Sequence, residues 1–258
     1  MFTMTIGIID SGLGGYSIFH ALHKAYPAAA FHFLADQKNA PYGNKTALEI
    51  QNIAKRNIEW FVANGIHEIV IACNTMNAVA LPLLKEQFPN VLFHDVVEPT
   101  VQQIPANTKS MLVVATKLTI HSDIYAKALR QRFPNMLVHS VVLPELVSMV
   151  EAMHSQVAMQ SYIEKELNIE HLQADAMILG CTHYPLARPA FDQIFKHPIY
   201  DSVQVMVDRF KHATLVSGEA LCSTTKDAYY AQLQVKELFQ SDVNFTKIEV
   251  DHETDPCR

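Results

Sequence analysis

The feature of the sequence that most limits the possible folds is a series of short apolar runs separated by longer segments with helical spacing. Strands are expected at 5–9, 30–35, 68–72, 91–96, 111–115, 137–142, 176–179 and 213–216. Helices are expected at 16–25, 47–64, 78–87, 122–132, 145–153, 159–167, 185–195 and 227–240. Near-continuous apolar strands that alternate with helices are typical of parallel sheets covered on both faces. The sequence therefore predicts an α/β protein.

Two of the apolar runs end in a cysteine that is followed by polar residues. These segments are VIACNTMNA at 70–78 and MILGCTHYP at 177–185, and they place Cys73 and Cys181 108 positions apart. The segments DS at 10–11 and FHFLAD at 31–36 have counterparts, TK at 116–117 and VHSVVL at 138–143, at nearly the same offset. The repeat indicates two similar α/β halves, although short apolar strands also match by chance. Facing halves would present both thiols to one cleft, because ligands of such sheets bind beyond the carboxyl ends of the strands.

The residues after each cysteine suggest a chemical role for the thiol. Asn-Thr follows Cys73 and Thr-His follows Cys181, and such residues start helices. A helix N-terminus stabilises a thiolate, so we expect a lowered cysteine pKa, and His183 could be the proton partner of Cys181. One buried cysteine is usually just a small apolar side chain, but two in matching contexts favour chemistry. Cys222 and Cys257 have no such context and are expected to be inert.

A glycine-rich loop follows the first expected strand. In IIDSGLGG, at 8–15, the glycines allow backbone N–H groups to face an anion. The spacing is not that of a dinucleotide fingerprint, whereas a carboxylate-binding loop fits the same physics. Asp10 could orient a substrate ammonium or tune a nearby thiol, or it could simply cap the next helix. The polar loop ADQKNAPYGN, at 35–44, is locally no more than a surface turn.

The composition excludes several classes of protein. The net charge is −6 and no Lys/Arg cluster occurs, which argues against a nucleic-acid or anionic membrane surface. No apolar run approaches the roughly 18 residues of a membrane span, and MFTMTIGIIDSG lacks the features of a signal peptide. A cytoplasmic protein with free thiols is expected. The thirteen histidines show no metal-ligand spacing, and no lysine stands in a PLP context, so no metal and no cofactor are expected.

The motifs together identify a family resemblance. IGIIDSGLGG, ADQKNAPYG, VIACNT, EPT, VVATKLTIHSDIY and LGCTHYPL stand in the order and spacing of the glutamate racemases, so the chain resembles this family from about residue 6 to residue 218. The resemblance implies two similar parallel-sheet α/β domains related by a pseudo-two-fold axis, with the active site in the cleft between them. One domain would comprise 1–97 plus 211–258 and the other 98–210.

The resemblance also implies a reaction and its residues. It implies PLP-independent conversion of L-glutamate to D-glutamate for peptidoglycan, with a homodimer as a possible assembly. Cys73 and Cys181 are implied as acid/bases on opposite faces of Cα, assisted by Asp10, His183 and Glu151. The implied substrate-binding residues are Asp10, Ser11, Pro41, Tyr42, Gly43, Asn74, Thr75, Thr116, Thr119, Thr182 and His183.

Three alternatives stay open on the residues alone. The same two thiols could racemise aspartate or another acidic amino acid. The glycine-rich loop could instead bind a phosphate or nucleotide in a regulatory module whose cysteines are inert. A single cysteine could act as the nucleophile of a hydrolase or isomerase, which would make Cys181 dispensable. Replacing Cys73 or Cys181 by alanine separates these readings.

Overall fold

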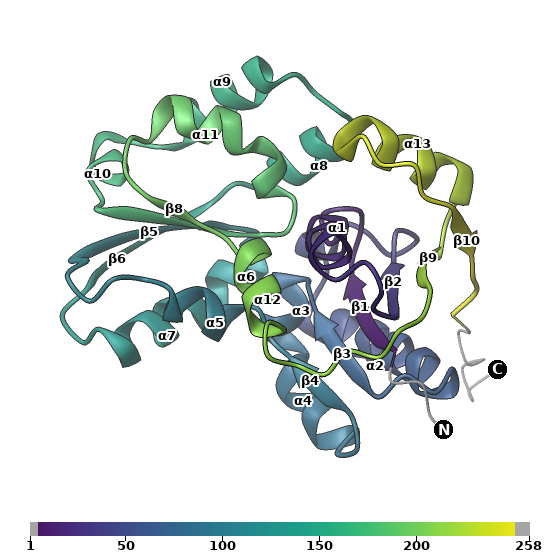
Figure 1. Ribbon diagram of the computed structural model, residues 1–258. Helices are drawn as coiled ribbons and strands as arrows, with labels where there is room; N and C mark the ends of the chain where they lie inside the picture. Colours follow the sequence, from purple (N-terminus) through teal and green to yellow (C-terminus); the bar gives the residue numbers. More distant parts are fainter. Residues whose placement is uncertain (1–4, 251–258) are drawn as a thin grey trace.

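The strands form two separate sheets, and every pairing among the named strands is parallel (Figure 1). The computed structural model describes residues 5–250, so Cys257 lies outside the described residues. The six-stranded sheet has the order β10-β9-β2-β1-β3-β4, with β1 Ile6–Asp10, β2 Phe31–Ala35, β3 Glu68–Ile71, β4 Leu92–His94, β9 Ala220–Thr224 and β10 Phe245–Lys247. The four-stranded sheet has the order β6-β5-β7-β8, with β5 Ser110–Ala115, β6 Leu137–Val142, β7 Ala176–Gly180 and β8 Ile199–Tyr200. The predicted α/β class is confirmed.

The helices that connect the strands are mostly short. They are α1 Tyr16–Ala25, α2 Ala47–Ala63, α3 Asn74–Val79, α4 Leu81–Gln87, α5 Val97–Gln102, α6 Lys117–His121, α7 Ile124–Arg132, α8 Leu146–Glu151, α9 Gln156–Glu166, α10 Ile169–Leu172, α11 Arg188–Ile194, α12 Val203–Arg209 and α13 Ala228–Phe239, with 3₁₀ turns η1 Tyr42–Asn44 and η2 Tyr184–Ala187. Among residues 5–250, no helix combines the length and apolar character that crossing a bilayer requires. We call the six-stranded sheet with α1–α4 and α13 the first lobe, and the four-stranded sheet with α6–α11 the second lobe.

The expected strand at 213–216 is wrong. This segment is irregular, and the residue after it, Ser217, forms one isolated antiparallel bridge with Ala29, shortly before β2. The strand that follows is β9, which lies beside β2 in the first sheet. β8, β9 and β10 were not predicted, because runs of two to five residues carry little periodicity of their own.

Two expected helices are broken in the structure. The expected helix at 78–87 is divided into α3 and α4 at Ala80, and Pro82 stands in the first turn of α4, where its missing N–H is tolerated. The expected helix at 122–132 begins only after Asp123, which has a left-handed backbone with φ of 62°. By contrast, α2 follows its sequence signals: Thr46 and Glu49 form a capping box. The buried positions of α2 then recur at helical spacing: Ile50, Ile53, Ala54, Asn57, Ile58 and Phe61.

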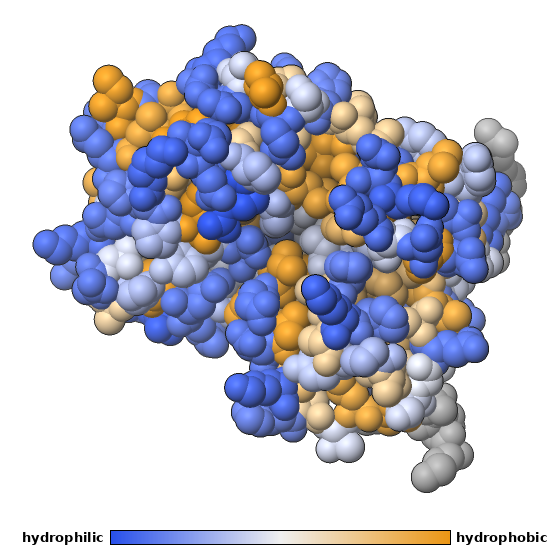
Figure 2. Space-filling view, turned by 45° about the horizontal axis from the view of Figure 1, so that its top comes forward, coloured by the Kyte–Doolittle hydropathy of each residue, from blue (hydrophilic) through white to orange (hydrophobic). Residues whose placement is uncertain are grey.

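Three apolar clusters form the core, and one of them joins the two sheets. Ile8 of β1 belongs to the central cluster, which also contains Val113 of β5 and Ile178 of β7 and thus joins both sheets. Alternate residues point to the outer faces, so Ile9 packs with α2 in a second cluster, and Leu112 packs in a third with α8, α9 and α11. On the outer surface in Figure 2, hydrophilic residues predominate and apolar ones occur in small groups. Each sheet is therefore buried on both faces, as the apolar runs predicted.

The carboxyl ends of the central strands meet where the two lobes face each other. β1 ends at Asp10, and β3 is followed by Cys73. In the second sheet, Thr116 follows β5 and Cys181 follows β7. The two ends are in contact, because the Thr182 hydroxyl donates a 3.1 Å hydrogen bond to the Asp10 carboxylate. This edge is where parallel sheets bind their ligands.

Candidate active site

A small pocket of about 70 Å³ lies between the two lobes at these strand ends. Cys73 and Cys181 both line it, each from a different sheet. The other lining residues are Ser11, Pro41, Tyr42, Gly43, Asn44, Asn74, Thr75, Thr116, Lys117, Pro144, Val147, Thr182 and His183. Another hollow, of about 540 Å³ near Lys38 and Arg56, contains none of the predicted site residues.

Cys73 occupies the N-cap of α3 and is almost completely buried. The Asn77 amide fixes the backbone at this point, because it donates a 2.9 Å hydrogen bond to the Cys73 carbonyl. Burial raises the pKa of the Cys73 thiol, and the nearby Asp10 carboxylate raises it further, whereas hydrogen bonds from Met76 and Ser11 lower it. The expectation of a lowered thiol pKa is wrong for Cys73: the Met76 N–H at the start of α3 does lower the pKa, but desolvation in so closed a site outweighs it. Together these contributions favour the neutral thiol form of Cys73.

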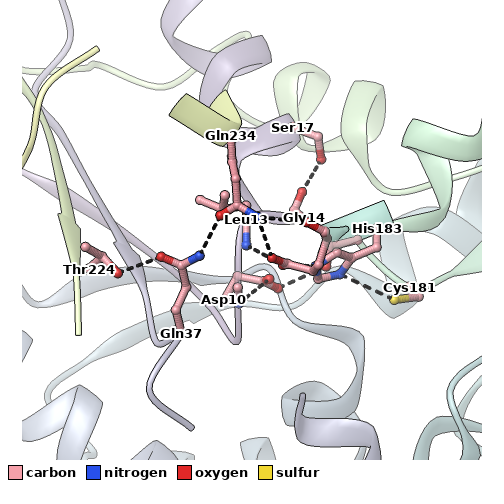
Figure 3. A network of polar contacts seen from close by, with 12 residues as sticks. Asp10, Leu13, Gly14, Ser17, Gln37, Cys181, His183, Thr224 and Gln234 are labelled. Carbon is pink, nitrogen blue, oxygen red and sulfur yellow. Dashed lines mark hydrogen bonds and ion pairs between the residues drawn. The ribbon is translucent and has the colours of Figure 1, made fainter. Parts of the chain in front are cut away.

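Cys181 has a different environment, shown in Figure 3. Its sulfur lies 3.9 Å from Nδ1 of His183, and Nε2 of His183 lies 2.7 Å from Oε1 of Glu151. Burial alone would lower the pKa of His183, but the contacts with Cys181 and Glu151 raise it well above its ordinary value. Burial likewise raises the pKa of Glu151, and the hydrogen bond and charge of His183 reverse this and lower it. The arrangement is a thiol–imidazole–carboxylate chain.

Asp10 lies behind the pocket and does not line it. The side chain is fully buried, and its carboxylate accepts hydrogen bonds from the Gly12 N–H and the Thr182 hydroxyl, both at 3.1 Å. Burial raises the pKa of Asp10, although the charge of His183 and these hydrogen bonds oppose the shift. Asp10 therefore contributes a buried carboxyl group beside Cys73 and a direct link between the lobes.

Three threonine hydroxyls form a buried triangle at the other end of the pocket. Oγ1 of Thr75 lies 2.9 Å from that of Thr116 and 3.3 Å from that of Thr119, and the last two are 3.0 Å apart. Thr75 and Thr116 line the pocket, whereas Thr119 lies behind them. Next to them, the Tyr125 hydroxyl donates to Oδ1 of Asn74 at 2.6 Å. Hydroxyl groups can rotate to donate to a carboxylate, so this end of the pocket suits an anionic group.

A buried carboxylate that the sequence did not single out holds the loop with Pro41, Tyr42 and Gly43. The Asp36 carboxylate accepts hydrogen bonds from the Tyr42 hydroxyl at 2.6 Å and from the Asn57 amide at 3.2 Å. It also accepts from Asn39 and Thr225. Asp36 directly follows β2. A charged residue at the end of an apolar strand is the sequence feature that could have indicated its role.

The structure brings all predicted site residues together, although not all of them reach the pocket. Asp10, Thr119 and Glu151 support it from behind. Sequence reasoning missed Asn44, Lys117, Pro144 and Val147, which also line it. Asn44 and Lys117 adjoin residues that were singled out, so the lysine could have been recognised as a cation for an anionic ligand. Within residues 5–250, no three His, Cys, Asp or Glu side chains are placed to hold a metal ion.

Comparison with known proteins agrees with this geometry. A glutamate racemase of Ralstonia nicotianae is 35% identical over 193 residues, which cover 73% of this chain and 69% of the relative. A glutamate racemase of Roseiflexus is 30% identical over 241 residues, which cover 86% and 87% of the two chains. The crystal structure of glutamate racemase from Francisella tularensis in complex with D-glutamate superposes with a TM-score of 0.89 at 25% identity, over 97% of this chain and 99% of that one.

The family match covers most of the same region. The family model described as Asp/Glu/Hydantoin racemase matches residues 6–210, which include both cysteines and all of the other predicted site residues. The resemblance found in the sequence is thus confirmed by independent means. By its sequence, its relatives and its fold, the chain belongs to the Asp/Glu/hydantoin racemase family.

Proposed function

We propose that the protein racemises glutamate at Cα without a cofactor, using Cys73 and Cys181 as the two acid/base groups. The observation that carries the proposal is that both thiols line one pocket from the carboxyl ends of two different sheets. Removing a proton from one face of Cα and returning one to the other needs a base and an acid on opposite walls. The glutamate racemase relatives and the D-glutamate complex of a structural neighbour support glutamate as the substrate.

The proposed step can be written for the enantiomer whose Cα proton faces Cys181. Cys181, as thiolate beside the His183 imidazolium, takes the Cα proton that faces it. The electron pair stays on Cα, and the Cys73 thiol donates its proton to the opposite face, so that Cys73 ends as thiolate and Cys181 as thiol. The opposite enantiomer requires the reverse distribution of protons. General acid–base catalysis by positioned groups contributes about 10²–10⁴-fold.

The carbanion needs stabilisation at the substrate carboxylates. The threonine triangle and Lys117 provide hydroxyl donors and a positive charge at the pocket wall. Fixed donors of this kind are commonly worth roughly 3–4 kcal/mol each. We infer that the substrate-binding residues are the pocket-lining members of the predicted set, with Asp10 and Thr119 as supports.

Several wider features are part of the same proposal. We propose domains at 1–97 plus 211–258 and at 98–210, related by a pseudo-two-fold axis. The product would supply D-glutamate for peptidoglycan in the cytoplasm. A homodimer stays a prediction, which sedimentation equilibrium tests directly.

The decisive experiment follows the circular dichroism of L-glutamate over time with purified protein, a thiol reductant and no added PLP. The wild type should abolish the signal as the racemate forms, and Cys73→Ala and Cys181→Ala should each lower the rate at least about 10²-fold. Cys222→Ala is the matched control, because this buried thiol lies in β9 outside the pocket. L-Aspartate in place of L-glutamate measures specificity. No racemisation of either amino acid by folded protein would refute the proposal, and activity in Cys181→Ala would favour a single-thiol reaction.

A further inference from the structure

A buried glutamine on the last helix contacts the thiol–imidazole–carboxylate chain from the other lobe. Gln234 of α13 is only 1% exposed. Its Nε2 lies 2.9 Å from the backbone oxygen of Glu151 and 3.3 Å from Oε2 of that carboxylate. Its Oε1 accepts a hydrogen bond from Gln37 at 3.3 Å, and Gln37 in turn accepts one from Thr224 at 2.8 Å (Figure 3).

This network fixes the Gln234 amide in one orientation. Its oxygen accepts from Gln37 and its nitrogen donates to Glu151. A flipped amide would place its nitrogen against the Gln37 donor and its oxygen against the Glu151 acceptor, so both hydrogen bonds would be lost. Buried polar groups with every partner satisfied are rigid. Thr224 ends β9 and Gln37 lies in the turn two residues after β2, so the network is anchored at the edge of the first sheet where these strands end.

The Glu151 carboxylate is held mainly by the opposite lobe. Oε1 contacts His183 and also accepts from the Leu13 N–H at 3.2 Å, while Oε2 accepts from Gln234. Leu13 and Gln234 belong to the first lobe, whereas Glu151 ends α8 of the second. Gly12 adjoins the same carboxylate so closely that a Cβ on it would lie 2.7 Å from Oε1. The carboxylate thus has its full set of partners only when the lobes are in contact.

We propose that Gln234 is a positioning residue for the reaction at Cys181. It holds the Glu151 carboxylate in the orientation that contacts Nε2 of His183, and this orientation depends on contact between the lobes. The inference rests on the proposed racemase function. With Nε2 donating to Glu151, Nδ1 of His183 is directed at the Cys181 sulfur. Without Gln234, the carboxylate can turn away or recruit water, and His183 loses part of its fixed partner. Gln234 would then affect proton transfer at Cys181 more than substrate binding.

The test compares Gln234→Leu with Gln232→Leu by steady-state racemisation in both directions, pH profiles of kcat and thermal unfolding. Gln232 is the matched control, because it lies on the same helix and its amide contacts Asn244 at an exposed site. Gln234→Leu should lower kcat about 10-fold, on the order of the contribution of one hydrogen bond, with KM within about twofold of wild type. The alkaline limb of the profile should move to lower pH, because a less well-held carboxylate stabilises the imidazolium less. Gln232→Leu should match the wild type.

Other results separate this proposal from its competitors. An unchanged kcat and pH profile in Gln234→Leu overturns it, and so does a lower kcat without any pH shift, which would indicate packing alone. If Gln234→Leu does not fold, the proposal is tested instead by the pH dependence of activity in Gln234→Glu. Its protonated carboxyl group can still donate to Glu151 at acid pH and repels it once ionised, so activity should recover on acidification; no recovery overturns the proposal. A wild type that racemises nothing, by contrast, refutes the proposed function itself.

Discussion

At the scale of single residues, the two thiols differ in what surrounds them. Cys73 is closed in by apolar contacts and a buried carboxyl group, whereas Cys181 has an imidazole partner within hydrogen-bond range. In the proposed mechanism, the two acid/base groups would therefore be unlike. The sequence placed both thiols correctly, because a cysteine at the end of an apolar run is a local signal. The raised pKa of Cys73 could not be predicted in the same way, since burial depends on segments distant in the chain.

His183 should make stability depend on pH. Its pKa is raised in the folded protein above the ordinary value of 6.5, so its stabilising contribution is complete below that value and is lost as pH rises through the raised pKa. Glu151, with a lowered pKa, contributes above its ordinary value of 4.5 and loses its contribution as pH falls. The difference in unfolding free energy between wild type and His183→Asn should thus shrink at alkaline pH. Urea unfolding at several pH values measures it; a difference that grows with pH contradicts the assignment.

Gly14 should tolerate no side chain, because the loop after β1 lies directly against the second lobe. A Cβ there would lie 2.5 Å from Nδ1 of His183 and 2.6 Å from Oγ1 of Thr182. Gly14→Ala should destabilise the fold by about 1–3 kcal/mol and lower kcat/KM more than 10-fold, roughly the loss expected when the geometry of reacting groups is disturbed. Differential scanning calorimetry and racemisation assays provide the two readouts.

Gly65 offers the contrasting control. It has φ of +75°, but nothing lies within 4 Å of an added Cβ. Gly65→Ala should cost about 1–2 kcal/mol of backbone strain and leave kcat/KM unchanged. Equal activity losses in both variants would mean that crowding against His183 is not the cause.

At the scale of elements, Asp36 should govern the loop that carries Tyr42. Asp36→Asn replaces one carboxylate oxygen, which accepts hydrogen bonds, by an NH₂ group, which donates them. The Tyr42 hydroxyl and the Asn57 amide are donors too, so the amide cannot satisfy them as the carboxylate does. The unfolding free energy should fall by about 2 kcal/mol, the range for hydrogen bonds to a charged group, and KM should rise because the loop lines the pocket. Asp192→Asn, in an exposed pair with Arg188, should change stability by less than about 1 kcal/mol. Chemical denaturation tests both, and equal losses would contradict the role of Asp36.

The elements themselves were predictable to different degrees. β1 to β7 were predicted from their apolar runs, which are the sequence signal of strands in a parallel sheet. β9 and β10 were not predicted, since their short segments become strands only through pairing with each other and with β2 in the assembled sheet. The support of Glu151 by Gln234 could not be predicted either. It arises between residues 83 positions apart, from helices in different lobes.

At the scale of the whole molecule, the shared central cluster should make unfolding a single event. Met111 of β5 packs in the same cluster as Ile8 of β1. Trp60, the single tryptophan, lies on α2 and reports on the first lobe, whereas far-ultraviolet circular dichroism reports on all helices. The two signals should give coincident urea transitions. Met111→Ala should shift both alike, by about 2–5 kcal/mol. An earlier transition of the tryptophan signal would show that the lobes unfold separately.

The position of β9 beside β2 has a consequence for how the chain is made. β1 to β4 emerge from the ribosome first, yet the neighbour that completes β2 is not made until residues 220–224, after the entire second sheet. Translation at about 5–20 residues per second makes this interval on the order of 10 to 40 s. Throughout it, one edge of β2 presents unpaired backbone groups, which are a template for wrong pairing. The nascent chain is therefore exposed to misassociation, and open to chaperones, for far longer than the pairing of two adjacent strands would require.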